Sequence, residues 1–163
     1  MFLSGRVAII TGGSRGIGRA IALTLSQKGA AVVVNYATNA GAAAEVVDNI
    51  RSRGGKAIAC KADVSDAGEA AGLVKEAQNQ FGRVDILVNN AGVTRDNLIL
   101  RMKDEDWEAV LGINLKGAFN CARAAARGML KNQYGRIINI SSVVGIIGNA
   151  GQANYCASKD RKS

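Results

Sequence analysis

The sequence predicts an α/β fold in which a doubly wound parallel sheet carries helices on both faces. Short β-branched runs alternate with longer segments of helical period, which is the pattern of repeated β-α-β units. The expected strands are apolar on both faces, as strands covered by helices on each side must be. With 48% apolar and 21% charged residues, the whole chain, 1–163, has the size of one domain with enough apolar material for a core.

The first strand and the first helix are predicted on either side of a glycine-rich turn. The apolar run 6–10 forms the strand. The helix follows over about 16–28, where apolar residues recur at helical spacing, and Gly29 caps its end. The residues expected on the buried side of this helix are Ile17, Ile21, Ala22 and Leu25.

The remaining elements are bounded by glycines and by a capping residue. They are expected as strands over 31–35, 56–62, 84–88 and 136–140 and as helices over 40–53, 66–81 and 103–132. Gly54 and Gly82 stop two of these helices, and the segment 63–66, Asp-Val-Ser-Asp, supplies an N-cap. We expect the last helix to be interrupted near Asn114 and the last strand to be followed by a loop over 141–151.

The composition excludes several kinds of site. The chain has no histidine, which rules out triads and zinc sites built on that residue, and we expect no bound metal. Cys60, Cys121 and Cys156 lack paired spacing and are expected as buried or half-buried free thiols in a reducing compartment. No apolar run approaches the roughly 20 residues of a membrane span. We therefore expect no membrane partner and a cytoplasmic chain, or one in an organelle matrix if a transit peptide was removed.

Basic residues outnumber acidic ones, 21 to 13, which gives a formal charge of +8. Such a surplus suggests nucleic acid as a partner. The basic residues are nevertheless scattered in ones and twos, and few aromatic residues are available to stack on bases. The sequence therefore favours an anionic cofactor or an acidic protein partner over nucleic acid, although a missing acidic segment would give the same imbalance.

A glycine turn between the first strand and the first helix is the first candidate site. Gly12 permits the tight turn, Gly16 lets the backbone approach a pyrophosphate at the helix N-terminus, and Gly18 lets the helix pack closely on the strand. The alternative is a purely structural glycine cluster. The residues expected to bind a dinucleotide are Gly12, Gly13, Ser14, Arg15, Gly16, Ile17 and Gly18.

The residue at the end of the second strand is expected to determine whether the site prefers NAD or NADP. An acidic residue there would accept hydrogen bonds from the adenosine ribose and repel a 2′-phosphate. Here the position holds the neutral Asn35, and Arg15 in the glycine turn can pair with phosphate. The sequence therefore predicts a preference for NADPH, with Arg15 as a solvated turn residue the alternative.

Two further strand ends are expected at the same edge of the sheet. Asp63 and Val64 follow the third strand, and Asn89–Gly92 follow the fourth. Open α/β sheets bind ligands at the carboxyl ends of their strands, so a cleft shared with the glycine turn is expected. The residues expected to contact the cofactor there are Asp63, Val64, Asn90, Ala91 and Gly92.

Tyr155 and Lys159 are four residues apart, which places both on one face of a helix. An ammonium group beside a phenol stabilises the phenolate and makes tyrosine a usable acid or base without histidine. This spacing alone is common by chance, so the pair gains weight only beside the other motifs.

Taken together, these motifs resemble those of the classical short-chain dehydrogenase/reductase family over about 4–159. The residues that carry the resemblance are the Gly12–Gly18 turn, Asn89–Gly92, Asn114, Ser142, Tyr155 and Lys159. The resemblance implies a Rossmann-like fold and a reaction that moves a hydride between NADPH and a ketone or alcohol.

The resemblance also assigns catalytic roles. Tyr155 would protonate the nascent alkoxide, and Lys159 would hold the nicotinamide ribose, so both also belong to the cofactor site. Ser142 would orient the substrate carbonyl, with Ser141 the less favoured candidate on spacing. Asn114, at the interruption of the long helix, would hold a water of the proton relay, or would be an ordinary helix kink.

Two stretches, 94–103 and 142–155, are similar to the branch of the family that reduces 3-oxoacyl groups on acyl carrier protein in type II fatty acid synthesis. The implied substrate is an acyl carrier protein thioester, and the implied assembly is a homotetramer. Reduction of another ketone, and a non-catalytic nucleotide-binding role, remain alternatives.

The chain has about five of the seven strands that the family has. We therefore expect a domain that is incomplete at its C-terminus, with much of the tetramer interface absent. The helix with Tyr155 and Lys159 would have about two turns, and the strand 136–140 would be an exposed apolar edge. Little or no turnover is expected from the chain alone.

Overall fold

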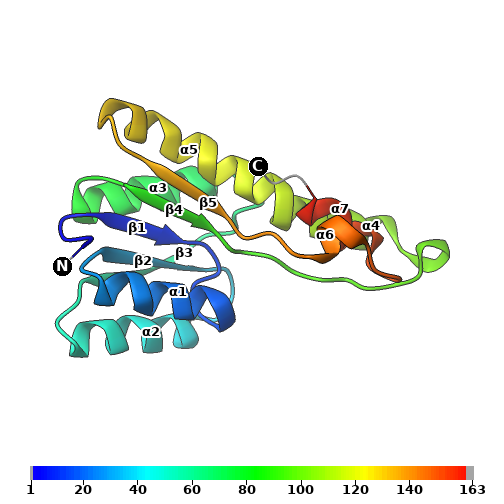
Figure 1. Ribbon diagram of the computed structural model, residues 1–163, viewed down its shortest axis with the longest axis horizontal. Coiled ribbons are helices and arrows are strands. Elements are labelled where there is room, and N and C mark those ends of the chain that lie inside the picture. The colour runs from blue at the N-terminus through cyan, green and yellow to red at the C-terminus, as the bar shows by residue number, and fades with distance from the viewer. Residues whose placement is uncertain (1, 161–163) are drawn as a thin grey trace.

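The computed structural model describes residues 2–160 and confirms the predicted α/β fold (Figure 1). Five parallel strands form one sheet in the order β3-β2-β1-β4-β5. The strands are β1 (Val7–Ile10), β2 (Ala31–Tyr36), β3 (Ala57–Lys61), β4 (Ile86–Asn89) and β5 (Arg136–Asn139). The helices are α1 (Gly16–Gln27), α2 (Ala40–Ser52), α3 (Ala67–Phe81), α4 (Asp104–Leu111), α5 (Gly117–Lys131), α6 (Val144–Ile147) and α7 (Ala153–Lys159).

The strand order places a topological switch point beside β1. From β1 the chain builds outward to β3, and it then returns to add β4 and β5 on the other side of β1. Helices α1 and α2 cover one face of the sheet, and α3 and α5 cover the other (Figure 1). Because all strands are parallel, their carboxyl ends lie along one edge, where such folds bind ligands.

Side chains of the central strands alternate between two apolar cores. The residues that face α1 and α2 are Ala8, Ile10, Val32, Val34, Ile86 and Val88. The residues that face α3 and α5 are Ile9, Val33 and Leu87. All nine are buried, and each Val, Leu or Ile in such a position stabilises the fold by about 1.5–3 kcal/mol.

Asp85 fastens the segment before β4 to the start of β1. Its fully buried carboxylate accepts a hydrogen bond from the N–H of Val7 (3.0 Å). The same carboxylate pairs with Arg6 (3.0 Å) and with Arg83 (2.6 Å). The guanidinium of Arg6 also lies 3.6 Å from the centre of the Tyr134 ring. This cluster joins three segments at the edge opposite the strand carboxyl ends.

The interruption predicted near Asn114 is confirmed. A π-helical turn, η2 (Gly112–Lys116), separates α4 from α5. Asn114 lies within this turn and is fully buried. A short 3₁₀ turn, η1 (Ile99–Arg101), was not predicted and lies between β4 and α4.

Two local predictions are wrong. Ile17, expected on the buried side of α1, is 63% exposed, because the side of this helix that packs inward is the one with the buried Gly18 and Ala22. The predicted loop 141–151 contains the short helix α6. One helical turn between Ser-Ser and Gly-Asn-Ala-Gly is too short for apolar periodicity to reveal.

Strand β5 is an exposed apolar edge, as predicted. Ile137 is 41% exposed and Ile138 is 46% exposed. The three cysteines are free thiols, with Cys121 buried and Cys60 and Cys156 half-buried, also as predicted. Within the described residues, every helix is too short or too polar to cross a bilayer.

Replacing Asp85 with alanine should strongly destabilise the fold. The change leaves two arginines without their shared carboxylate and one N–H without its acceptor, so the free energy of unfolding should fall by about 3 kcal/mol. Urea denaturation measures this loss. Asp85→Asn keeps an oxygen for Val7 and should lose less, and an Asp85→Ala variant as stable as the unsubstituted chain would contradict the role of the cluster.

The thiol of Cys121 should resist alkylation in the folded chain. Burial raises the pKa of Cys121 to about 12, whereas an unfolded cysteine ionises near about 8.5. The stability that this thiol contributes is present below about pH 8.5 and is lost as the pH rises toward 12. Mass spectrometry after iodoacetamide treatment at about pH 9 should find Cys121 unmodified in folded protein and modified in urea, and equal labelling in both would contradict the account.

Candidate active site at the carboxyl edge of the sheet

The ends of β1 and β4 are joined by a network centred on Thr11. Its Oγ1 accepts hydrogen bonds from the N–H groups of Asn90 and Ala91, both at 2.9 Å. In return, Nδ2 of Asn90 donates to the carbonyl oxygens of Thr11 (2.9 Å) and Gly12 (3.1 Å). The predicted proximity of the glycine turn and the 89–92 segment is therefore present in the structure.

The glycine turn has the shape of an anion cradle. Gly12 and Gly16 have positive φ angles of 60° and 52°, a conformation that glycine adopts at little cost. A Cβ atom at Gly18 would collide with the carbonyl oxygen of Gly12 and lie 2.5 Å from Nδ2 of Asn90. Among the described residues, no side chain caps the first turn of α1 and that turn holds no acidic residue, so its N–H groups face outward uncapped. Such a helix start binds anions.

The structure places the side chain of Asn35, one of the residues predicted at the cofactor, in the interior at the end of β2. Its side chain is only 2% exposed. The Oδ1 atom accepts a hydrogen bond from Gly12 N–H, and Nδ2 donates to carbonyl oxygens at the end of β3. The residues that follow β2 at the surface are Ala37 and Thr38, and the amide of Asn35 is committed to the glycine turn and to the end of β3.

The residues predicted at the end of β3 lie at the same edge. The Asp63 carboxylate accepts hydrogen bonds from the backbone N–H (2.9 Å) and the hydroxyl (2.7 Å) of Ser65. Val64 is buried against Gly117, where a Cβ would come within 2.6 Å of Cγ2 of Val64. This contact holds the start of α5 against the segment after β3.

The predicted pair on α7 is in place. The Nζ atom of Lys159 lies 5.6 Å from the centre of the Tyr155 ring. Lys159 is 4% exposed, and its Nζ donates to the carbonyl oxygen of Ile140, just after β5, at 2.9 Å. A Cβ at Gly92 would lie 3.5 Å from Nζ of Lys159 and 3.2 Å from Oδ1 of Asn114. The end of β4 therefore reaches both predicted catalytic residues.

The side chain of Asn114 hydrogen-bonds two segments that are distant in the sequence. Its Oδ1 accepts the N–H of Val93 (2.8 Å), while Nδ2 donates to the Val93 carbonyl oxygen (3.0 Å) and to Oγ of Ser158 (2.9 Å). The hydroxyl group of Ser158 in turn donates a hydrogen bond to the carbonyl oxygen of Tyr155 (2.8 Å). The amide thus joins the segment after β4 to the helix that carries Tyr155.

Sequence reasoning missed two residues of this site. Ser158 and Asn154 are both fully buried. Nδ2 of Asn154 donates to the carbonyl oxygens of Arg95 (2.9 Å) and Asp106 (3.3 Å), which fixes the start of α7. Both stand within or next to the Tyr155-to-Lys159 spacing, but their partners lie in distant segments, so no local sequence signal marked them.

The two serines after β5 have different surroundings. Ser141 donates its hydroxyl to the carbonyl oxygen of Lys159 and so holds the end of α7. Ser142 is half-buried, and within residues 2–160 its hydroxyl has no hydrogen-bond partner. This difference favours Ser142 as the serine available to a substrate.

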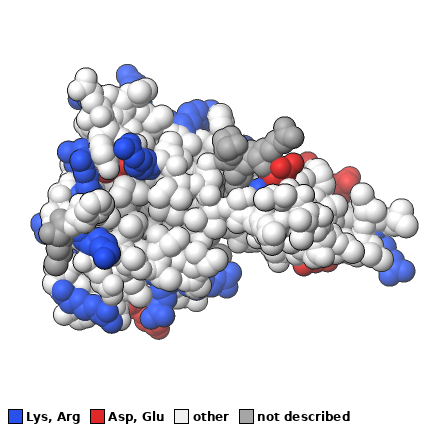
Figure 2. Space-filling view, viewed as in Figure 1, with Lys and Arg blue, Asp and Glu red and all other residues white. Residues whose placement is uncertain are grey.

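Charged side chains spread in small groups over the sheet and its helices, as the sequence suggested (Figure 2). The face around α6 and α7 carries little charge in this view. Exposed apolar side chains there are Val143 (64%), Ile146 (86%) and Ile147 (74%).

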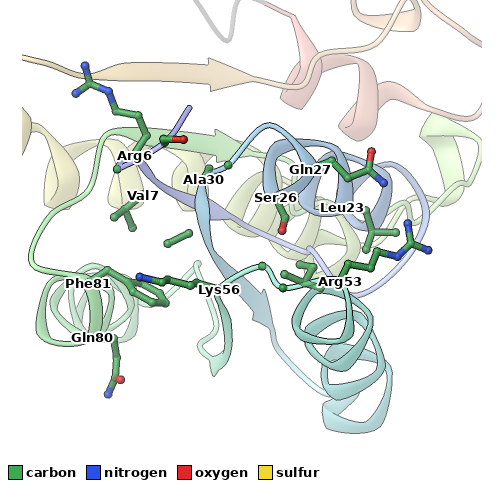
Figure 3. A pocket seen from close by; sticks show the side chains of 17 residues that line it. Arg6, Val7, Leu23, Ser26, Gln27, Ala30, Arg53, Lys56, Gln80 and Phe81 are labelled. Atoms are coloured by element: carbon green, nitrogen blue, oxygen red, sulfur yellow. The ribbon is translucent and has the colours of Figure 1, made fainter. Parts of the chain in front are cut away.

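A hollow of about 670 Å³ lies at the opposite edge of the sheet. The ends of α1, α2 and α3 contribute Gln27, Arg53 and Phe81 to its lining. In Figure 3 the Lys56 side chain extends beside Phe81, whereas the Arg53 guanidinium points away. Helix C-termini carry partial negative charge, which these cations offset. The hollow therefore lies at helix ends that favour cations rather than anions.

Comparison with known proteins agrees with this geometry. Residues 6–160 match the sequence model of a family described as short chain dehydrogenase. A 3-oxoacyl-[acyl-carrier-protein] reductase of Synechocystis sp. is 55% identical over 157 residues, covering 96% of this chain and 64% of the relative. A protein of that name from Staphylococcus aureus is 53% identical over 152 residues, covering 93% of this chain and 62% of the relative.

A solved structure gives the same picture. The crystal structure of a short chain dehydrogenase from Mycobacterium avium superimposes with a TM-score of 0.91 at 44% identity. The match covers 98% of this chain and 60% of that chain. The chain thus spans somewhat under two thirds of the length of the relatives it matches.

Replacing Gly18 with alanine should destabilise the turn. The added methyl group overlaps the backbone of Gly12 and the amide of Asn90, so the free energy of unfolding should fall by about 1–3 kcal/mol. The matched control is Gly72→Ala in α3, where a Cβ meets nothing within 4 Å. That change should be neutral or should stabilise the helix by up to about 1 kcal/mol. Equal stability of the two variants in urea would contradict the close approach at Gly18.

Proposed function

The chain belongs to the short-chain dehydrogenase family, and we propose that it binds NADPH at the carboxyl edge of its sheet and serves the reduction of 3-oxoacyl groups on acyl carrier protein. The observation that carries the proposal is the buried Lys159. Its ammonium lies beside the Tyr155 ring and within reach of Asn114 and Gly92, at the same edge as the glycine turn. A buried lysine beside a tyrosine suits acid–base chemistry better than packing.

The glycine turn fits the pyrophosphate of a dinucleotide. The space where a Gly18 side chain would lie is closed by Gly12 and Asn90, which keeps the backbone of the turn close to the start of α1. The uncapped N–H groups of α1 then offer donors to a doubly charged group. Asp63, Val64, Ala91 and Gly92 would line the adenosine and nicotinamide ends of the same cleft.

We propose NADPH rather than NADH on the charges around the end of β2. The exposed Arg15 opens α1 with an unused side chain, and the first turn of α2 contains no acidic residue. A 2′-phosphate would therefore meet a cation and no carboxylate from these two helix starts.

The residues of the site suit proton delivery to a ketone oxygen. The chemistry that a bound reduced nicotinamide brings to this site is hydride transfer to the ketone carbon. Ser142 would hold the carbonyl oxygen through its free hydroxyl, and Tyr155 would donate its proton to that oxygen as negative charge develops. Lys159 would stabilise the remaining phenolate by its charge.

Asn114 would support the relay through its backbone. The amide side chain is already committed to Val93 and Ser158. A π-helical turn leaves carbonyl oxygens free to accept a water. A water there would resupply a proton to the active site, which is the role that the sequence suggested for this residue.

An acyl carrier protein thioester is the proposed substrate. The relatives that carry this name in their titles match almost the whole chain. The surplus of basic residues, +8 in total, suits an acidic protein partner.

Turnover by the 163 residues themselves should be slow at best. Helix α7 spans seven residues, fewer than the ~12–15 that an isolated helix needs, so it holds its shape only through the contacts of its buried residues. Its neighbour α6 is four residues long and holds the largely exposed Ile146 and Ile147. A purely nucleotide-binding role is therefore the second candidate function.

The test is single-turnover oxidation of NADPH by excess protein in the presence of an acetoacetyl thioester. We expect slow thioester-dependent oxidation, which Tyr155→Phe should reduce by about 100-fold or more because only the proton donor is lost. NADPH affinity, measured by calorimetry, should change little in this variant.

Each other outcome contradicts a stated part of the proposal. Equal oxidation by Tyr155→Phe would remove Tyr155 from the chemistry. Tight NADPH binding with no thioester-dependent oxidation would favour the nucleotide-binding role. Absence of NADPH binding would overturn the proposed function altogether.

A further inference from the structure

We propose that Asn35 is a positioning residue for the glycine turn, which it holds in its cofactor-binding shape whichever nicotinamide dinucleotide is offered. The inference rests on the cofactor role proposed above and goes beyond it. Asn35 lies in β2, whereas the turn lies between β1 and α1. Its effect on binding is exerted through the turn, without contact to the ligand.

Asn35 bridges the turn and the end of β3 with both ends of its side chain. Oδ1 accepts the N–H of Gly12 at 3.2 Å. Nδ2 donates to the carbonyl oxygens of Ala62 (3.0 Å) and Cys60 (3.3 Å). The backbone carbonyl of Asn35 also accepts the N–H of Gly13 at 2.9 Å. One buried residue thus satisfies two consecutive N–H groups of the turn.

These bonds decide which N–H groups remain for a ligand. The N–H groups of Gly12 and Gly13 point toward Asn35 and are unavailable to phosphate. Those of the first turn of α1 have no side-chain cap and stay available. Asn35 therefore binds the N–H groups of Gly12 and Gly13 and leaves those at the start of α1 without a side-chain cap.

Gly12 depends on this support because glycine has no Cβ atom to restrict its backbone dihedral angles. Its φ of 60° is one of several conformations open to glycine. Without Oδ1, the buried N–H of Gly12 would lack its acceptor, and conformations that turn it toward water would gain population. Apparent affinity falls in proportion to the fraction of chains that keep the binding shape.

The choice of variant separates this role from cofactor selection. If Asn35 selected the cofactor, Asn35→Asp would favour NADH, because a carboxylate accepts ribose hydroxyls and repels a 2′-phosphate. As a positioning residue, Asn35→Asp keeps an oxygen for Gly12 but turns the other oxygen toward the carbonyl oxygens of Ala62 and Cys60. The pyrophosphate is common to both dinucleotides, so both affinities should fall together.

Calorimetry with NADPH and NADH tests the proposal on the unsubstituted chain, Asn35→Asp and Asn35→Ala. In both variants we expect the Kd values for NADPH and NADH to rise by a similar factor, about tenfold if a tenth of the chains keep the turn. The ratio of the two Kd values should stay within about twofold of its original value, because the pyrophosphate is common to both ligands. Circular dichroism sets a temperature at which each variant is folded.

Ile50→Val is the matched control for general loss of stability. Ile50 is 1% exposed and lines the hollow at the opposite edge of the sheet. Removing one methylene there weakens the core without touching the turn. This variant should melt at a lower temperature and bind both dinucleotides with unchanged Kd.

Three results would overturn the proposal alone. One is a shift of Asn35→Asp toward NADH, which would restore the selector role. Another is an unchanged Kd for both ligands in a folded Asn35→Ala. If Asn35→Ala does not fold, Asn35→Ser takes its place, and failure of this variant to fold as well would make Asn35 a fold residue only. Failure of the unsubstituted chain to bind either dinucleotide would instead overturn the proposed cofactor role, and this inference with it.

Discussion

The side-chain network that joins β1 to β4 determines where everything else in the site can lie. At a switch point the chain leaves two neighbouring strands in opposite directions, so the segments after them diverge unless something holds them together. Here four hydrogen bonds cross that divide, two between Thr11 and Asn90, one from Asn90 to Gly12 and one from Ala91 to Thr11. The glycine turn, the end of β4 and the residues behind it are thereby fixed to one another before any ligand is present.

The proposed catalytic residues are likewise held by hydrogen bonds to segments that follow strands of the sheet. Lys159 reaches the carbonyl oxygen of Ile140, just after β5, and Asn114 holds Val93, just after β4. Both contacts are made to backbone atoms at strand ends, so the position of α7 follows from the register of the sheet. Ser158 then couples Asn114 to the helix itself. A polar side chain buried at 0–4% exposure requires such partners, which is why these contacts are specific.

Much of the fold and of the glycine turn could be predicted from the sequence, because these features depend on local sequence patterns. The strands, the glycine turn and the break at Asn114 each have a pattern of their own, and each strand was predicted within two residues of its observed bounds. Burial was harder to predict, because it depends on how a helix packs on the sheet: Ile17 is apolar and in the helix, yet it is 63% exposed. Sequence gives the place of Asn35 in the strand but not its rotamer, so its contacts with the glycine turn could not be predicted. The roles of Ser158 and Asn154 depend on contacts with distant segments, which no local pattern records.

The central claim is that these residues form a nucleotide-binding edge that exists before the ligand arrives. Thermal unfolding of the 163-residue chain, with and without NADPH, tests it most directly. A ligand that binds only the folded state adds about 2.7 kcal/mol at a hundred times its Kd. The account predicts one cooperative transition that NADPH moves to higher temperature. A sharp transition that NADPH leaves unchanged would contradict it, because the folded chain would then not bind NADPH.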